Sequence, residues 1–237
     1  MEKFKPLVII PTYNEKENIL EIIPEILALK KEFHILIVDD NSPDGTGEAA
    51  DKLVEKYQGQ VFVLHRKGKA GLGRAYLAGF KWALKKDYDL IFEMDADGSH
   101  LPKFLLDFLE KIKNYDLVIG SRYYKKRLSV VNWDLRRVVL SVLGNFYARI
   151  VTRVPVSDMT AGFKCFRRHV LETIDLDKII SEGYSFQIEM NWRVYKSGFK
   201  IGEIPIIFYE RRHGDSKMSA NIIKEALWIL WRMLFRK

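Results

Sequence analysis

The sequence contains one cysteine, Cys165, and no long hydrophobic run. A single cysteine excludes an internal disulfide and a cysteine-rich metal site, and it is typical of proteins in a reducing compartment. The uncharged stretches at 138–148 and 226–231 span 11 and six residues, whereas a membrane-spanning helix needs about 20 apolar residues. The first residues lack the basic leader and the cleavage site of a signal peptide. We therefore expect a cytoplasmic protein with no transmembrane segment.

Linkers, internal repeats and low-complexity segments are also missing from the sequence. The 237 residues are 48% hydrophobic and 30% charged, which is ordinary for a globular protein and excludes a disordered chain. This length suits one large domain whose core needs no disulfide. We expect a single domain over residues 1–237 with a basic C-terminal extension.

Acidic residues are scarce in the second half of the chain. Residues 1–120 carry 17 Lys and Arg against 20 Asp and Glu, a net charge of −3, whereas residues 121–237 carry 22 against 11, a net charge of +11. Such asymmetry favours a polyanionic partner for the second half: a nucleic acid, an anionic membrane surface or a phosphorylated substrate. The alternative is a solvated basic surface.

What the sequence does contain is an alternation of short apolar runs with helical patterns. Aliphatic and β-branched runs predict strands at 7–10, 35–38, 61–64, 90–92 and 117–119, separated by helices at 15–31, 46–57, 72–86 and 102–113. The second half predicts helices at 133–150 and 184–197, strands at 162–166 and 201–209, and a loop at 153–161. The alternation predicts an α/β fold with an open, mostly parallel sheet and crossover helices.

The first helix carries two local signals. Asn14 and Glu17 have the spacing of a capping pair. Pro24 predicts a kink or an interruption, because proline removes a backbone donor from the helix.

Polar residues gather where the five predicted strands of the first half end. They are Pro11–Glu15, Asp39–Gly45, Arg66–Gly73, Asp95–Asp97 and Ser121–Tyr123. Ligands of open α/β sheets bind beyond the carboxyl ends of the strands, so we expect these segments to line one site.

Two pairs of carboxylates stand out in these segments. Asp95 and Asp97 share one short turn, and two such oxygen ligands together with diphosphate oxygens suit Mg²⁺ or Mn²⁺. An exposed acidic turn is the alternative. Asp39 and Asp40 end the second strand, where a carboxylate can bond a ribose or a base, although Asn-Ser-Pro-Asp-Gly is also a strong turn sequence.

Several catalytic motifs are missing. Gly68, Gly71 and Gly73, with basic neighbours, predict a phosphate-binding loop before a helix, but they match neither the Walker pattern nor the dinucleotide fingerprint. There is no Gly-x-Ser-x-Gly elbow, and the apolar surroundings of Cys165 indicate a buried thiol. His100 has no metal-binding partner at helical spacing, so we interpret it as structural. The sequence offers no nucleophile for covalent catalysis.

Basic residues of the second half lie beside apolar or turn segments. Arg136 and Arg137 open an apolar helix, while Arg211 and Lys217 flank a Gly-Asp-Ser segment. Arginine binds phosphate in bidentate fashion and lysine binds it as a point charge. A solvated basic face is the alternative.

The last helix has two apolar faces. Trp228, Trp231 and Phe235 form one of them, and Lys and Arg residues flank both. This pattern predicts an interfacial helix on anionic lipid. A crevice or a dimer contact is the alternative.

Together these segments resemble the inverting nucleotide-sugar transferases of the A-type glycosyltransferase fold, and specifically the dolichol-phosphate mannosyltransferase branch. The resemblance covers nearly the whole chain. Its segments are Pro11–Glu15, Val38–Thr46, Gly71–Gly73, Met94–Asp97 with Ser99 and His100, Gly120–Tyr123, Trp133 with Arg136 and Arg137, Ser157–Phe163, Gly183–Tyr184 with Phe186, Gln187, Glu189 and Met190, and Arg211 with Gly214, Ser216 and Lys217.

The resemblance implies a role for each matching residue. It gives Asp95, Asp97, Arg122 and Asp158 catalytic roles, and it places Mg²⁺ or Mn²⁺ on the first two. Ser99 stands where some relatives carry a metal-coordinating glutamine. Arg137 and Ser141 would meet the acceptor phosphate. The donor-binding positions would be Pro11, Tyr13, Glu15, Val38, Asp40, Ala96, Gln187, Glu189, Arg211 and Lys217.

The implied activity is transfer of mannose from GDP-mannose to a polyprenyl (dolichyl-type) monophosphate with inversion. Residues 1–122 would bind nucleotide sugar and metal, residues 123–218 would face the acceptor, and residues 219–237 would form the amphipathic interfacial helix. The enzyme would be peripheral on the cytoplasmic face of a membrane, with a small membrane subunit as a candidate partner.

Three alternatives stay open at this point. The first is a glucosyltransferase that uses UDP-glucose and the same lipid. The second is a catalytically silent membrane adaptor. The third is a basic nucleic-acid-binding protein, which the acidic first half and the lack of a nucleic-acid-binding motif disfavour.

Overall fold

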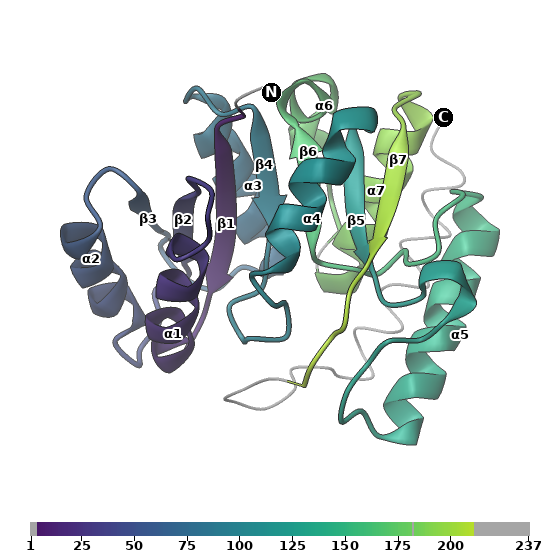
Figure 1. Cartoon of the computed structure of the whole chain (residues 1–237), viewed down its shortest axis with the longest axis horizontal. Coiled ribbons are helices and arrows are strands. Elements are labelled where there is room, and N and C mark those ends of the chain that lie inside the picture. The colour runs from purple at the N-terminus through teal and green to yellow at the C-terminus, as the bar shows by residue number, and fades with distance from the viewer. Residues whose placement is uncertain (1–3, 182, 211–237) are drawn as a thin grey trace.

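The computed structural model describes residues 4–181 and 183–210, and these form one sheet of seven strands in the order β3-β2-β1-β4-β6-β5-β7 (Figure 1). β6 is antiparallel to both of its neighbours, β4 and β5, and every other pair of neighbouring strands is parallel. The predicted α/β fold with a mostly parallel sheet is therefore confirmed. The strands are β1 (Pro6–Thr12), β2 (His34–Asp39), β3 (Val61–His65), β4 (Leu90–Glu93), β5 (Leu117–Ser121), β6 (Lys164–Arg167) and β7 (Ile201–Pro205).

Helices cover both faces of this sheet, as Figure 1 shows. Side chains of α1, α2 and α4 share one hydrophobic cluster with one face of the sheet, whereas α3, α6 and α7 share the other. Every residue of β1, β4 and β5 is buried, because these apolar strands are packed on both sides. The helices are α1 (Lys16–Leu27), α2 (Thr46–Lys56), α3 (Leu72–Leu84), α4 (Phe104–Lys111), α5 (Leu135–Thr152), α6 (Arg168–Thr173) and α7 (Gly183–Lys196), with short 3-10 turns η1 (Ile112–Asn114), η2 (Tyr124–Lys126) and η3 (Leu176–Lys178).

The capping prediction for the first helix was wrong, and Pro24 does not interrupt the helix. α1 begins after Glu15, and Asn14 adopts a left-handed conformation (φ 57°) in which its backbone N–H donates to Ser42 Oγ. The helix also continues through Pro24 to Leu27. The carbonyl that loses a partner to Pro24 belongs to Leu20, which lies on the exposed side of the helix, so water can satisfy it.

The second half differs from the prediction in its details. The strand predicted at 201–209 ends at Pro205, and α6 was not predicted. α6 has only six residues, too few for a helical period to show in the sequence. The predicted tail helix at 219–237, with Trp228, Trp231 and Phe235, lies outside the described residues.

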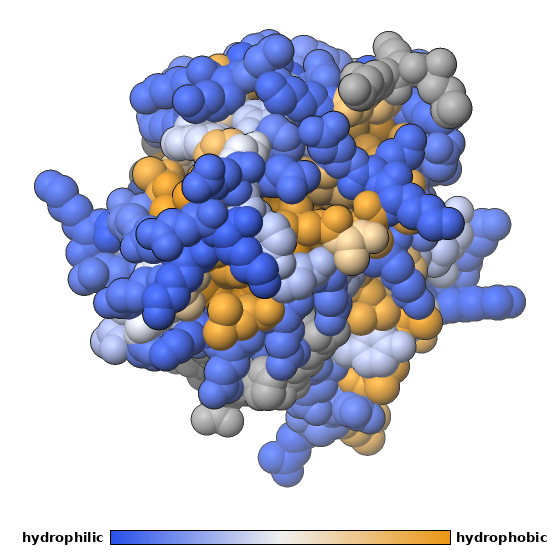
Figure 2. All heavy atoms as spheres, turned by 60° about the vertical axis from the view of Figure 1, so that its left-hand side comes forward, coloured by the Kyte–Doolittle hydropathy of each residue, from blue (hydrophilic) through white to orange (hydrophobic). Residues whose placement is uncertain are grey.

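The surface of α5 is unusually apolar. On the face turned forward in Figure 2, hydrophilic side chains predominate and hydrophobic ones form separate patches. Of the twelve exposed large hydrophobic side chains in the described residues, seven lie on α5: Leu135, Val139, Leu140, Val142, Leu143, Phe146 and Ile150. The described residues contain no helix with the length and apolar character that a membrane span requires.

Candidate functional site

The predicted binding segments meet at one edge of the sheet. β1 to β5 all point the same way, so their carboxyl ends lie at this edge. β6 runs in the opposite direction, and the residues that precede it, 157–163, therefore reach the same edge. Segments from both halves of the chain thus contribute to one site.

Asp40 follows β2 and is nearly buried. Nη1 of Arg66 donates to its Oδ1 at 2.5 Å, and the backbone N–H of Ala70 donates to its Oδ2 at 3.4 Å. Burial raises the pKa of Asp40, while the positive charge of Arg66 opposes that rise. The ion pair ties the loop after β3 to the end of β2.

Asp39 and Asp44 instead stabilise the turn between β2 and α2. Oδ1 of Asp39 accepts from Ser42 Oγ at 2.6 Å, and Oδ1 of Asp44 accepts from the hydroxyl and the backbone N–H of Thr46. Burial acts to raise the pKa of Asp44, but these hydrogen bonds outweigh it and the pKa is lowered. Of the two adjacent aspartates, only Asp40 contacts the loop after β3 through its carboxylate.

The β1 side of the site is formed by the residues around the start of α1. Pro11 and Val38 are register partners on β1 and β2, and both are buried. Nζ of Lys69 lies 4.3 Å from the ring centroid of Tyr13, and Glu15 is the buried N-cap residue of α1. An aromatic ring, a cation and a carboxylate therefore line this side.

Asp95 and Asp97 lie on the turn that follows β4. The hydroxyl of Tyr76 donates to Asp95 Oδ1 at 3.2 Å, and the backbone N–H of Asp95 donates to Nδ1 of His100 at 3.1 Å. The hydroxyl and backbone N–H of Ser99 donate to Asp97 Oδ1 at 2.5 and 3.1 Å. Burial lowers the pKa of His100 to about 4, so the ring is neutral at pH 7 and Nδ1 can accept. Neighbouring groups thus fix the orientation of the turn and of both carboxylates.

A buried pair of opposite charges adjoins this turn. Glu93 ends β4 and Lys164 begins β6; they are register partners, both fully buried, with Nζ 4.0 Å from Oε2. Nζ also donates to Oε1 of Gln187 at 2.5 Å and to its carbonyl at 3.1 Å. Burial raises the pKa of Glu93 to about 7 and lowers the pKa of Lys164 to about 8. The pair connects α7 to the strands beside Asp95.

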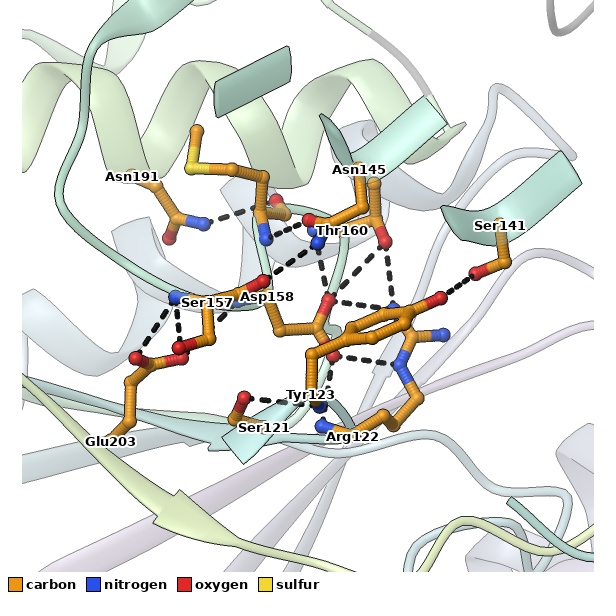
Figure 3. A network of polar contacts seen from close by, with 11 residues as sticks. Ser121, Arg122, Tyr123, Ser141, Asn145, Ser157, Asp158, Thr160, Asn191 and Glu203 are labelled. Carbon is orange, nitrogen blue, oxygen red and sulfur yellow. Dashed lines mark hydrogen bonds and ion pairs between the residues drawn. The ribbon is translucent and has the colours of Figure 1, made fainter. Parts of the chain in front are cut away.

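Arg122 and Asp158 form a bidentate ion pair inside the protein (Figure 3). Nε and Nη2 of Arg122 donate to the two carboxylate oxygens, both at 2.8 Å, and Nη2 also donates to Thr160 Oγ1 at 2.7 Å. The guanidinium carbon lies 5.7 Å from the ring of Trp133 and 5.5 Å from that of Phe208. Burial acts to raise the pKa of Asp158, but the charge of Arg122 outweighs it and the pKa is lowered.

The loop that carries Asp158 is held from three elements (Figure 3). The carboxylate of Glu203, on β7, accepts from the backbone N–H of Ser157 at 2.9 Å. Asn145, on α5, donates to the carbonyl of Ser157 and accepts from the N–H of Met159, while Asn191, on α7, donates to the carbonyl of Met159. These bonds fix α5 against the site.

The start of α5 places a second arginine near Arg122. The guanidinium carbon of Arg137 lies 4.2 Å from the Trp133 ring, and its Nη1 lies 3.6 Å from Glu210. Tyr123 donates to the hydroxyl of Ser141 at 2.7 Å. Nε of Arg137 and the indole nitrogen of Trp133 are buried and have no acceptor among the described residues. Buried donors without an acceptor favour an anionic ligand.

Comparison with known proteins identifies the family. Residues 7–175 match Glycosyl transferase family 2, which is well over half of the chain. The chain belongs to this family. The predicted membership is confirmed, and the protein is a glycosyltransferase.

Two relatives of this glycosyltransferase are similar over almost its whole length. The polyprenol monophosphomannose synthase of Mycolicibacterium smegmatis is 49% identical over 225 residues, 94% of this chain and 84% of that protein. The undecaprenyl-phosphate mannosyltransferase of Micrococcus luteus is 46% identical over 221 residues, 93% of this chain and 90% of that protein. A mannosyltransferase of Pyrobaculum calidifontis, solved with GDP-Man and Mn²⁺, shares the fold with a TM-score of 0.66 at 15% identity, over 98% of this chain and 65% of that one.

The structure of this glycosyltransferase brings most of the predicted site residues to the sheet edge. They are Pro11, Tyr13, Glu15, Val38, Asp40, Asp95, the buried Ala96, Asp97, Arg122, Asp158 and Gln187. Glu189 is instead bonded within its own region, since its carboxylate accepts from Arg193 Nε at 2.8 Å and from the hydroxyl of Ser181. Arg211 and Lys217 lie outside the described residues.

Several residues of the site were missed by the sequence reasoning. Tyr76, Asn145 and Glu203 contact it from elements distant in the sequence, and nothing local marks them. Lys164 does carry a signal: it is the one charged residue of the strand predicted at 162–166, and a buried lysine is rarely without a partner. That anomaly predicts a buried acid nearby, which is Glu93.

The acidic turn fits a divalent cation that the substrate helps to hold. Two carboxylates lie on one turn, and the side chain of Asp95 is 30% exposed. Ser99 donates its hydroxyl to Asp97, so it supports that carboxylate. Within residues 4–181 and 183–210, no group of three His, Cys, Asp or Glu side chains is arranged to hold a metal. Mg²⁺ commonly takes one or two protein carboxylates and completes its shell with substrate phosphates and water.

Proposed function

We propose that this glycosyltransferase transfers mannose from GDP-mannose to a polyprenyl monophosphate with inversion, giving a β-linked product. The observation that carries the proposal is 49% identity over nearly the whole chain to a polyprenol monophosphomannose synthase. The GDP-Man and Mn²⁺ bound to a mannosyltransferase of the same fold support the donor and the cation. The site adds an acidic turn, two arginines and an apolar helix at one edge of the sheet.

The donor would bind along β1, β2 and β4. Tyr13 and the Asp40–Arg66 pair lie where the nucleoside would sit, with Pro11 and Val38 forming the buried floor. Ala96 and Gln187 would complete the donor side. From the resemblance alone we assign Arg211 and Lys217 to the diphosphate, and we give Glu189 a supporting role on the donor side because its carboxylate is bonded to Arg193 and Ser181. Asp95 and Asp97 would hold Mg²⁺ or Mn²⁺, which neutralises charge that develops on the departing nucleoside diphosphate.

The acceptor phosphate would bind at the start of α5. Arg137 offers a charge that Glu210 balances only at 3.6 Å, and its buried Nε lacks an acceptor. The Trp133 indole N–H also lacks an acceptor among the described residues. Ser141 follows Arg137 by one turn of α5, and its hydroxyl accepts from Tyr123. A phosphate monoester would satisfy these donors.

The acceptor needs no general base. A phosphate monoester has a second pKa near 6, so about nine tenths of it is dianionic at pH 7 and can attack the sugar carbon directly. Asp158 is bonded to Arg122 and its pKa is lowered, so it stays ionised and holds the guanidinium in place. The chain's task is to hold two anions in line, and in-line attack inverts the anomeric centre.

The enzyme would work as a peripheral protein on the cytoplasmic face of a membrane. A polyprenyl tail stays in the bilayer, and the exposed apolar side chains of α5 would contact that bilayer beside the acceptor site. The tail 219–237, for which the sequence predicts an amphipathic helix, would add a second contact. A small membrane subunit is a candidate partner.

Separate measurements of the two substrates test this function. Wild-type protein should bind GDP-mannose in a Mn²⁺-dependent manner and in preference to UDP-glucose. In the transfer reaction, Arg137→Ala should raise the KM for polyprenyl phosphate more than the KM for the donor, whereas Arg136→Ala, an exposed neighbour, should change both little. Preference for UDP-glucose would make the protein a glucosyltransferase on the same lipid. Failure to bind any nucleotide sugar would favour a silent membrane adaptor.

A further inference from the structure

We infer that Tyr76 is a positioning residue for the catalytic cation, acting through the carboxylate of Asp95. This inference rests on the proposed role of Asp95 and goes beyond it, because it concerns a residue on α3 outside the acidic turn. Tyr76 is fully buried, and its hydroxyl donates to Asp95 Oδ1 at 3.2 Å. The hydroxyl is the only polar group of this side chain, and its hydrogen bond is directed at the carboxylate of Asp95.

The ring of Tyr76 is fixed independently of that hydrogen bond. It stacks on Phe186 of α7 with the centroids 6.0 Å apart and the planes 4° from parallel, and it also contacts Phe80 on its own helix at 6.3 Å. α3 and α7 approach closely at this point, since a Cβ on Gly73 would lie 2.9 Å from the Phe186 ring. The aromatic packing therefore places the hydroxyl, and the hydroxyl in turn selects the orientation of Asp95.

Asp95 is held on both its backbone and its side chain. His100 accepts from the backbone N–H, and Tyr76 donates to Oδ1. A carboxylate that is partly exposed, as Asp95 is at 30%, would otherwise sample several rotamers before it met a cation. Groups that orient metal ligands in this way typically change metal affinity about 10–100-fold when they are removed.

Tyr76→Phe is the sharpest test, because it removes one oxygen and keeps the ring that packs on Phe186. Tyr88→Phe is a matched control: Tyr88 is also a buried tyrosine, but its hydroxyl pairs with Nδ1 of His34 at 3.0 Å. Mn²⁺ affinity is measured directly by the loss of the free-ion EPR signal, with GDP present, and thermal stability is measured in parallel.

We expect Tyr76→Phe to weaken Mn²⁺ binding about 10-fold or more. Tyr88→Phe should bind Mn²⁺ as the wild type does, and the two variants should have similar thermal unfolding temperatures. In turnover, the Mn²⁺ concentration at half-maximal rate should rise while the rate at saturating Mn²⁺ changes little. Equal Mn²⁺ affinity in all three proteins would overturn the role of Tyr76. No Mn²⁺ binding by the wild type would instead overturn the proposed metal site, so the two failures are distinguishable.

Discussion

At the scale of single residues, the site depends on charges that partners hold in place. Asp97 receives two hydrogen bonds from Ser99, Asp95 is bonded by Tyr76, and Asp158 is locked to Arg122. None of these carboxylates belongs to the hydrophobic core. A substitution in the acidic turn should therefore lower turnover, whereas a substitution in the buried ion pair should lower the free energy of unfolding.

Asp97→Asn should abolish transfer and leave the fold intact. The amide keeps the size of the side chain and can still accept from Ser99, but it removes a charge from the proposed cation site. We expect turnover at limiting Mn²⁺ to fall by about 100-fold or more, with circular dichroism and thermal unfolding close to the wild type. Near-normal turnover would mean that the cation lies elsewhere.

Asp158→Asn should mainly destabilise the protein. Removing one partner of a buried ion pair leaves the other charge uncompensated, at a cost of about 3–5 kcal/mol in the free energy of unfolding. The pKa of Asp158 is lower in the folded state than its ordinary value of 3.8. The stabilisation is therefore complete above about pH 4 and is lost as pH falls through the folded-state pKa.

Denaturant titrations from pH 7 to pH 3 check this expectation. The difference in the free energy of unfolding between wild type and Asp158→Asn should be constant near neutral pH and should become smaller in acid. Asp175→Asn serves as the control, since Asp175 also has a lowered pKa but its pair with Lys178 is exposed. A difference that stayed constant down to pH 3 would contradict the assigned ion pair.

At the scale of elements, α5 is an inverted amphipathic helix. Its buried residues include Asn145 and Thr152, whereas Leu143, Phe146 and Ile150 are 58–59% exposed. A helix buries its apolar side in the core unless another apolar phase is available. The hydrogen bonds of Asn145 to the loop 157–159 give the reason for this orientation.

The double variant Leu143→Ser/Phe146→Ser should bind liposomes less than the wild type does. Burial of each side chain in lipid can contribute about 1–3 kcal/mol, and the folded state should tolerate both changes because both side chains are exposed. Flotation with polyprenyl-phosphate liposomes measures the effect. Leu20→Ser on α1, at 48% exposure, is the control and should float as the wild type does. Equal flotation of all three proteins would exclude α5 as a membrane contact.

The elements show where sequence reasoning succeeds and where it fails. The apolar runs at 7–10, 35–38, 61–64, 90–92 and 117–119 predicted β1 to β5. Strands buried on both faces leave a continuous apolar signal, and the partly buried edge strand β3 is apolar enough to leave one too. The direction of β6 and the orientation of α5 were not predicted. Both depend on hydrogen bonds between residues far apart in the chain, such as Glu203 with Ser157, and no local pattern encodes these.

The candidate site was predictable to a similar extent. The acidic turn and Asp40 follow strands and so were found from their positions. Arg122 illustrates the limit: the resemblance implied a catalytic role for it, but no local pattern in the sequence predicts its bidentate pair with Asp158. A partner 36 residues away cannot be assigned from charge alone.

At the scale of the whole molecule, the charge is divided unequally. The second half carries a net charge of +11 and the first half −3. If the basic half faces a membrane, flotation should be stronger with anionic than with zwitterionic vesicles. Raising the salt from about 0.05 M to 0.5 M should remove this difference, since the Debye length shortens to a few ångströms. Flotation that does not depend on salt would exclude an electrostatic contribution of the basic half and would attribute membrane binding to apolar contacts.

The position of β6 has a consequence for how the chain is made. Within residues 4–181 and 183–210, β5 pairs only with β6 and β7, and both follow it in the sequence, while one edge of β4 is open until residues 164–167 arrive. A nascent chain would therefore carry a half-sheet with an unpaired edge at β4 while residues 122–167 are translated. A chain stopped after residue 122 should aggregate even though it holds the acidic turn and the strands that precede it. The site at the carboxyl ends of the strands is thus completed late, when the antiparallel strand β6 is inserted between β4 and β5.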